Sequence, residues 1–218
     1  MTEDGHSAPN SHVAHSGHIF MLARKSYERA VEADKYESLS SILLSAIGLE
    51  SFINELEHRL QAERFTQEQE RLRDLAYTLS ALEQRRAGIV QKIDAIRYFL
   101  TGEKPDWGAQ PYQDLRFLSG LRNELVHRKP ESFVFAMDDP DRTYEPHRYV
   151  QYLVERGVID APHPQSPPQW SAYVVRPETA GWAYNTVVEI ISNLVSILPE
   201  GNFARISRFL TKELRPLT

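Results

Sequence analysis

The segment from Glu37 to about Gln61 constrains the fold most, because an expected helix there carries apolar residues on two sides. Six residues recur at helical spacing and share one face: Ile42, Ala46, Leu49, Ile53, Leu56 and Leu60. Three further residues lie on a second face: Leu43, Ile47 and Asn54. A helix that is apolar on two faces needs neighbouring elements on more than one side. The pattern therefore predicts a central helix surrounded by other helices.

The rest of the chain supplies such neighbours. Helical periodicity recurs over residues 18–33, 66–86, 89–100, 111–128, 202–214 and a run that begins at Pro177 or Thr179 and ends at Leu198. We therefore expect a mainly α protein, an up-and-down bundle of about five to six helices. Residues 17–129 and 178–218 would form this bundle.

Residues 130–177 differ from the rest and hold eight of the 13 prolines in the chain. Two short apolar runs, Ser132–Met137 and Ser171–Val175, are typical of strands and are expected to pair as a β-hairpin. Between them, Pro146 to Arg156 predicts a short helix closed by Gly157. The segment is therefore predicted to be a small Pro-rich α+β insertion in the bundle.

Composition narrows the class of protein further. Residues 1–16 are mostly polar and predict a disordered tail. The net charge of −5 argues against a protein that coats nucleic acid by bulk electrostatics. The longest apolar runs are shorter than the roughly 18 residues of a membrane span, and no signal segment follows Met1. Since the chain also lacks cysteine, we expect a cytoplasmic protein without membrane contact, metal ion or other cofactor.

A polar cluster near the end of the 111–128 helix is the best candidate site. Arg122 lies within the apolar stripe of that helix, where a solvated arginine has no reason to be, and Asn123 and His127 are neighbours one turn apart. Glu50 of the central helix lies beside an apolar stripe and needs a cationic partner, for which Arg122 is the candidate. Arg122, Asn123 and His127 are the predicted site, supported by Glu50 and Asn54.

Spacing alone would not select this cluster. An Arg followed by a His after four to six residues is expected roughly twice by chance in a chain of this composition. The two other examples, Arg142 with His147 and Arg156 with His163, lie in the Pro-rich insertion. The helical setting of Arg122 and His127 distinguishes the first pair.

In this setting, the segment Leu121 to His127 resembles the motif of the HEPN family, the "higher eukaryotes and prokaryotes nucleotide-binding" helical domains. Members of this family carry an Arg, a polar residue and a His near the end of a late helix, and a long early helix with an internal acidic residue similar to Glu50. The resemblance covers residues 18–130 and 178–214. It implies a homodimer whose paired motifs form one cleft, RNA as substrate, a toxin or defence role, and an antitoxin or other regulatory protein as partner.

The residue types suit metal-independent RNA cleavage by attack of a 2′-OH on the adjacent phosphate. His127 would act as base or acid, Arg122 would hold the phosphate, and Asn123 would orient either group. The alternative is a non-catalytic helical module for dimerisation or for binding a nucleotide or protein partner. In that case Arg122 pairs with Glu50 only to lock two helices together.

Overall fold

The computed structural model describes residues 15–62, 69–127, 145–163 and 169–200, together with a few positions between 205 and 217. This part of the chain contains eight helices and no strand, which confirms a mainly α fold. The helices are α1 (Ser16–Glu32), α2 (Glu37–Ala62), α3 (Glu70–Gln84), α4 (Ile89–Thr101), α5 (Tyr112–Val126), α6 (Arg148–Glu155), α7 (Trp170–Val174) and α8 (Pro177–Ser196).

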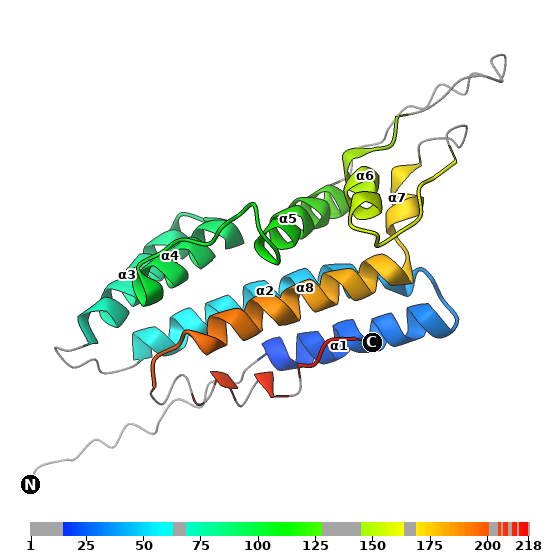
Figure 1. The fold of residues 1–218 in the computed structure, drawn as a ribbon. Coiled ribbons are helices and arrows are strands. Elements are labelled where there is room, and N and C mark those ends of the chain that lie inside the picture. Colours follow the sequence, from blue (N-terminus) through cyan, green and yellow to red (C-terminus); the bar gives the residue numbers. More distant parts are fainter. Residues whose placement is uncertain are drawn as a thin grey trace, which may run out of the picture.

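The long helices α2 and α8 lie side by side through the middle of the bundle (Figure 1). Helix α1 runs along one side of this pair and contacts both helices. On the other side, the α3–α4 hairpin packs at one end of α2, and α5 packs over both α2 and α8. The short helices α6 and α7 contact each other at the far end of the bundle. Helix α2 is therefore the central helix that the sequence predicts.

Two stripes of α2 are buried, and only one of them is the stripe predicted from apolar spacing. The six residues of the first predicted stripe are all buried. The second predicted stripe is not a core surface, because Ile47 is 37% exposed. A different face is buried instead, formed by small residues and one aromatic: Ser38, Ser41, Ser45, Gly48 and Phe52. Small side chains on this face let neighbouring helices approach α2 closely.

Gly48 is where this close approach is most demanding. A Cβ atom added at Gly48 would lie 2.5 Å from the Cε1 atom of Phe20, a fully buried residue of α1. The ring of Phe20 therefore occupies the volume that any larger residue at position 48 would need. This glycine is required by packing, since its backbone is helical.

The predicted insertion is only partly correct. Helix α6 and the positive φ of 66° at Gly157 confirm the short helix and its glycine stop. The strand predicted for Ser171–Val175 is wrong, because these residues lie largely in helix α7. Trp170 and Val174 are both buried and are one helical turn apart, so a helix buries them together. The partner strand predicted at 132–137 lies outside the described residues.

Helix boundaries differ from the predictions in several places. Helix α3 begins at Glu70 and α5 ends at Val126, while the predicted start at Thr66 and the predicted end near Arg128 lie outside the described residues. Helix α1 already includes Ser16, a buried residue of the predicted tail, whose hydroxyl donates to Glu55. Residues 1–14 of that tail and most of the predicted helix at 202–214 lie outside the described residues.

Helix α2 is also the one helix in the described ranges that is long and apolar enough to cross a membrane. Half of its most apolar stretch is buried inside the bundle. Buried core helices can have the same length and composition, so this one helix is weak evidence for a membrane span.

We expect Gly48→Ala to destabilise the fold, although alanine favours helix formation. Overpacking against Phe20 costs about 1–3 kcal/mol and exceeds the roughly 1 kcal/mol gained in helix propensity. The free energy of unfolding, measured by urea denaturation, should fall by about 1 kcal/mol. Gly17→Ala is the matched control, because a Cβ there meets nothing within 4 Å. Equal stability of the two variants would contradict close packing at Gly48.

Candidate functional site

Helix α5 carries the predicted site and is anchored by a buried apolar stripe. Leu115, Leu118 and Leu121 are buried against the bundle core. Pro111 stands at the N-cap, and the helix ends with His127 at the C-cap. Val126, which the periodicity places in the core stripe, is instead 50% exposed. The apolar stripe therefore fixes which side of α5 faces α2, but its residues are less buried near the end of the helix.

Arg122 reaches Glu50 of α2, as the sequence predicts. Its Nη2 atom lies 3.6 Å from Oε2 of Glu50, and the two side chains are 26% and 45% exposed. This separation is an ion contact and exceeds the length of a good hydrogen bond. Nη1 donates to Oδ1 of Asn123 at 2.9 Å, while Nε is buried without a partner in the described part of the chain. Glu50 therefore neutralises Arg122 without occupying all of its donors.

Arg122 and Asn123 border a cleft of about 340 Å³ that is open to solvent. We call it the Arg122 cleft. Its walls come from α2, the α3–α4 turn and α5: Glu50, Asn54, Glu83, Arg86, Ala87, Gly88, Ile89, Lys92, Ser119, Arg122 and Asn123. The structure thus brings together four of the five predicted residues. His127 does not line the cleft.

His127 lies apart from Arg122 because of helix geometry. Five residues advance an ideal helix by about 140°, so the two side chains leave α5 in different directions. His127 is exposed, and its backbone N–H donates to the carbonyl of Asn123. Within the described part of the chain, Arg122 and His127 of one copy therefore do not line the same cleft.

Lys92 is a buried residue of this site that the sequence analysis missed. The residue is only 4% exposed, and its Nζ donates to Oδ1 of Asn54 at 2.7 Å and to the carboxylate of Glu83. Glu57, also buried, lies 3.9 Å from the same nitrogen. Burial raises the pKa of Glu57, and the nearby Lys92 charge opposes that rise. Lys92 thus joins α2, α3 and α4 through one ammonium group.

A sequence signal for Lys92 exists. It stands one turn from both Ile89 and Ile96, two buried residues of α4, so helical spacing places it on the buried face. Asn54, predicted as a supporting residue, has a concrete partner in Lys92.

The turn between α3 and α4 adds a strained arginine to the cleft. Arg86 has a φ of 54°, the left-handed region that favours glycine. Its backbone N–H donates to the carbonyl of Glu83, which closes the end of α3. In the described part of the chain, the Arg86 guanidinium has no ion-pair partner. The cleft therefore holds three cations, Arg86, Lys92 and Arg122, against the carboxylates of Glu50 and Glu83.

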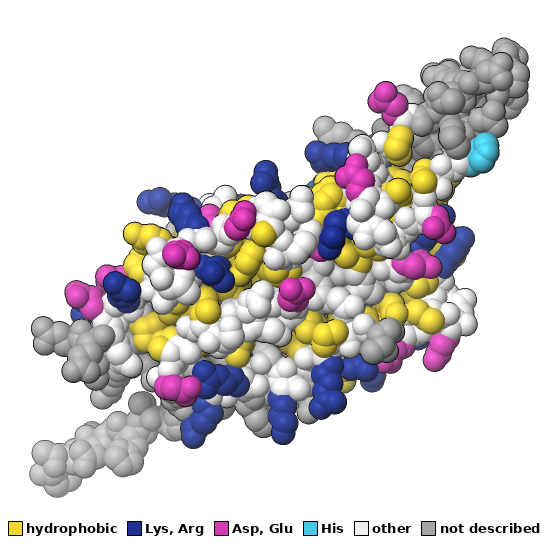
Figure 2. Space-filling model, in the orientation of Figure 1, with side chains coloured by type: hydrophobic (Ala, Val, Ile, Leu, Met, Phe, Trp, Pro, Cys, Tyr) yellow, Lys and Arg dark blue, Asp and Glu magenta, His cyan; other side chains and the backbone are white. Residues whose placement is uncertain are grey.

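The face of the molecule drawn in Figure 2 carries no broad basic surface. In Figure 2, lysine and arginine side chains are spread along both long edges of the molecule, with acidic side chains among them. The described residues contain no group of three or more His, Asp or Glu side chains placed to hold a metal ion. Any affinity of this cleft for an anion would come from the local arrangement of Arg86, Lys92 and Arg122.

Comparison with known proteins adds no family assignment. The chain matches no protein-family model, and no curated protein or solved structure matches it.

Replacing Lys92 tests whether its charge stabilises the bundle. Lys92→Met leaves the buried carboxylate of Glu57 unpaired, and we expect the free energy of unfolding at neutral pH to fall by about 3 kcal/mol. Glu83→Gln, at a side chain that is 53% exposed, should cost less than about 1 kcal/mol. Urea denaturation of both variants measures the difference.

The pH dependence provides an independent check. Because the pKa of Glu57 is raised above 4.5, the folded state holds this proton to higher pH than the unfolded chain. The stability that the Glu57 carboxyl contributes is therefore fully present below pH 4.5 and is lost as the pH rises through its raised pKa in the folded state. Lys92→Met should consequently destabilise less at pH 4 than at pH 7. A pH-independent difference would contradict the pairing.

Proposed function

We propose that this protein is a HEPN-like, metal-independent endoribonuclease of toxin or defence type. The environment of Arg122 carries the proposal. Its side chain lines an open cleft, donates a hydrogen bond to Asn123 and keeps other N–H donors that Glu50 does not satisfy. An arginine in this state suits a phosphate group, which its planar fork binds through paired hydrogen bonds. Arg86 and the start of α4 add positive potential to the same cleft.

The proposed reaction uses the substrate's own nucleophile. The 2′-oxygen attacks the adjacent phosphorus, the bond from phosphorus to the 5′-oxygen breaks, and a 2′,3′-cyclic phosphate and a 5′-hydroxyl result. One His127 accepts the proton of the 2′-OH, and a second, protonated His127 donates a proton to the leaving 5′-oxygen. Arg122 stabilises the charge that develops on the phosphorane, and Asn123 orients Arg122 through their hydrogen bond.

The proposal requires two copies of the chain, because His127 of one chain does not line its own cleft. A symmetric dimer with α5 near the two-fold axis would direct His127 of each copy toward the Arg122 cleft of the other. Val126 leaves exposed apolar surface beside His127, which a second copy could cover. An antitoxin or other regulatory protein would act by covering the same surface. The cytoplasm, where RNA and such a partner are present, is the proposed location.

The alternative function is a non-catalytic helical module for dimerisation or for binding a nucleotide or protein partner. The contact of Arg122 with Glu50 favours it, since this pair joins α5 to α2. In this role the cleft is a structural junction, and Glu50 and Glu83 would repel a phosphate. Activity of purified protein distinguishes the two functions.

The decisive experiment incubates purified protein with tRNA and mRNA in EDTA. We expect cleavage by the wild type, and losses of about 10²-fold or more for Arg122→Ala and His127→Ala. His18→Ala and Arg73→Ala are matched controls at exposed positions of α1 and α3 and should keep full activity. Circular dichroism and light scattering must show that all variants are folded and equally oligomeric. A folded wild type that cleaves neither RNA supports the binding module instead.

Arg86→Gly separates stability from function. Glycine relieves the strain of the positive φ, so the free energy of unfolding should rise by up to about 1 kcal/mol. RNA binding should nevertheless weaken, and the slope of log Kd against log salt concentration should decrease by about one unit, because one phosphate contact is lost. Unchanged RNA affinity in a stabilised variant would remove Arg86 from the proposed site.

A further inference from the structure

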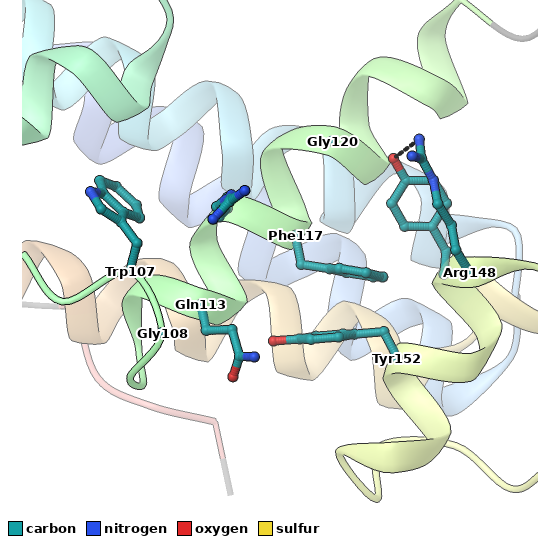
Figure 3. Close-up of a pocket in the computed structure, with 9 residues that line it drawn as sticks. Trp107, Gly108, Gln113, Phe117, Gly120, Arg148 and Tyr152 are labelled. Atoms are coloured by element: carbon teal, nitrogen blue, oxygen red, sulfur yellow. Dashed lines mark hydrogen bonds between the residues drawn. The ribbon is translucent and has the colours of Figure 1, made fainter.

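A second pocket of about 500 Å³ lies between α5, α6 and the loop before α5 (Figure 3). We call it the aromatic pocket. Four aromatic side chains and two arginines define its chemistry: Trp107, Phe117, Tyr149, Tyr152, Arg116 and Arg148. Neither the predicted motif nor the Arg122 cleft includes any of these residues.

The aromatic rings are held in place by direct contacts. Phe117 and Tyr152 are stacked with ring centroids 3.6 Å apart, and Tyr149 meets Phe117 edge-on at 4.9 Å. The hydroxyl of Tyr152 donates to the buried carboxylate of Asp114 at 2.6 Å. Burial and this hydrogen bond raise the pKa of Tyr152 to about 12, so the hydroxyl stays a donor. Rings fixed in this way lose little entropy when a ligand binds.

Asp114 also ties α6 to α5. Arg156 donates to both oxygens of Asp114 at 3.0 Å, which neutralises the carboxylate beneath the pocket. Gly120 keeps the pocket open at its other end, because a Cβ there would lie 2.9 Å from the hydroxyl oxygen of Tyr149. The pocket is therefore formed by the fold and presents no uncompensated negative charge from Asp114.

Two guanidinium groups supply the pocket with positive charge. Arg116 is exposed and has no hydrogen-bond or ion-pair partner in the described part of the chain. Arg148 is 69% exposed, lies over the Tyr149 ring and donates to its hydroxyl (Figure 3). Its carboxylate contact, Glu124, is 3.6 Å away. Aromatic side chains beside two guanidinium groups, of which Arg116 has no partner in the described part of the chain, match the chemistry of a flat base that carries a phosphate.

Helix α5 connects this pocket to the proposed catalytic residues. Arg116, Gly120, Asn123 and His127 follow one another at helical spacings of four, three and four, so they share one side of α5. From Arg116 to Asn123 the helix rises about 10 Å. A nucleic-acid strand that contacts His127 and Asn123 can therefore continue along this ridge into the aromatic pocket.

We propose that the aromatic pocket binds an unpaired nucleotide of the RNA strand, outside the scissile position. The base contacts the aromatic side chains, and Arg116 and Arg148 hold its phosphate. The choice of RNA as ligand rests on the proposed function, but binding in the pocket can be measured without cleavage. The requirement for an accessible base selects single-stranded RNA over a duplex.

The test uses a fluorescein-labelled, single-stranded RNA octamer. Its 2′-hydroxyls are methylated, so the RNA cannot be cleaved by 2′-OH attack. Binding to the full chain is followed by fluorescence anisotropy. Arg116→Ala should raise the Kd about tenfold, as expected for loss of one charge-assisted contact. Arg71→Ala, at an exposed arginine of α3 that does not line the pocket, is the matched control and should change it less than about twofold.

Tryptophan fluorescence reports on the base itself. A base that stacks in the pocket should quench Trp107, and the quenching should disappear in Trp107→Phe. The other two tryptophans, Trp170 and Trp182, do not line the pocket, so the emission that remains in Trp107→Phe should not change on binding. Equal affinity of wild type and Arg116→Ala, without quenching, overturns the proposal. If AMP binds through Arg116 but the octamer does not, the proposal is also overturned, and the ligand of the pocket is a free nucleotide.

The two proposals fail separately. If the wild type does not cleave RNA but binds the octamer through Arg116, the pocket stands and the nuclease assignment falls. If the wild type cleaves RNA and Arg116→Ala changes neither octamer binding nor cleavage, the pocket proposal alone is wrong.

Discussion

The ammonium group of Lys92 is the interaction on which the candidate site depends. A charge that is removed from water is costly unless partners surround it, and Lys92 has Asn54, Glu57 and Glu83 around its nitrogen. These partners belong to α2 and α3, so the charge can be satisfied only when the α3–α4 hairpin is seated on α2. The same seating places the α3–α4 turn opposite α5, and the space between them is the Arg122 cleft. A requirement of folding thus creates the cavity that a function can use.

Apolar spacing predicts most of the helices, because a buried face is the main determinant of a helix in a bundle. It fails where burial does not involve large apolar residues. Ser41, Ser45 and Gly48 are buried on α2, yet a pattern of large apolar residues counts them as neutral or polar. Their small volume is what matters, since it lets Phe20 come into contact with the helix. A five-residue segment such as Ser171–Val175 fails for another reason, because it is too short for helical and strand periodicities to be told apart.

The candidate site could be predicted to the level of helix faces but not of side-chain partners. Angles along α5 and α2 indicate that Arg122 and Glu50 can meet, and they do so at 3.6 Å. The same angles separate Arg122 from His127 by about 140°, so a motif read along the sequence does not imply convergence within one chain. Two cations of the cleft, Lys92 and Arg86, lie outside the motif. Helical spacing places Lys92 on a buried face of α4, but the position of both residues in the cleft depends on which helices meet. Contacts between helices that are distant in sequence depend on packing, which local patterns do not encode.

If the protein is the proposed two-fold symmetric nuclease, the aromatic pocket bears on a problem that such an enzyme must solve. In a two-fold dimer both copies of His127 have the same surroundings, yet the reaction needs one to accept a proton and the other to donate one. An RNA strand has a direction from 5′ to 3′ and therefore cannot contact the two copies equivalently. The aromatic pocket, as proposed, would fix this direction by holding a nucleotide on one side of the scissile phosphate. The strand, once held in this way, would decide which His127 faces the 2′-OH and which faces the leaving 5′-oxygen. Strand binding and the division of catalytic roles would then be one event, set by residues that lie about two helical turns from the motif.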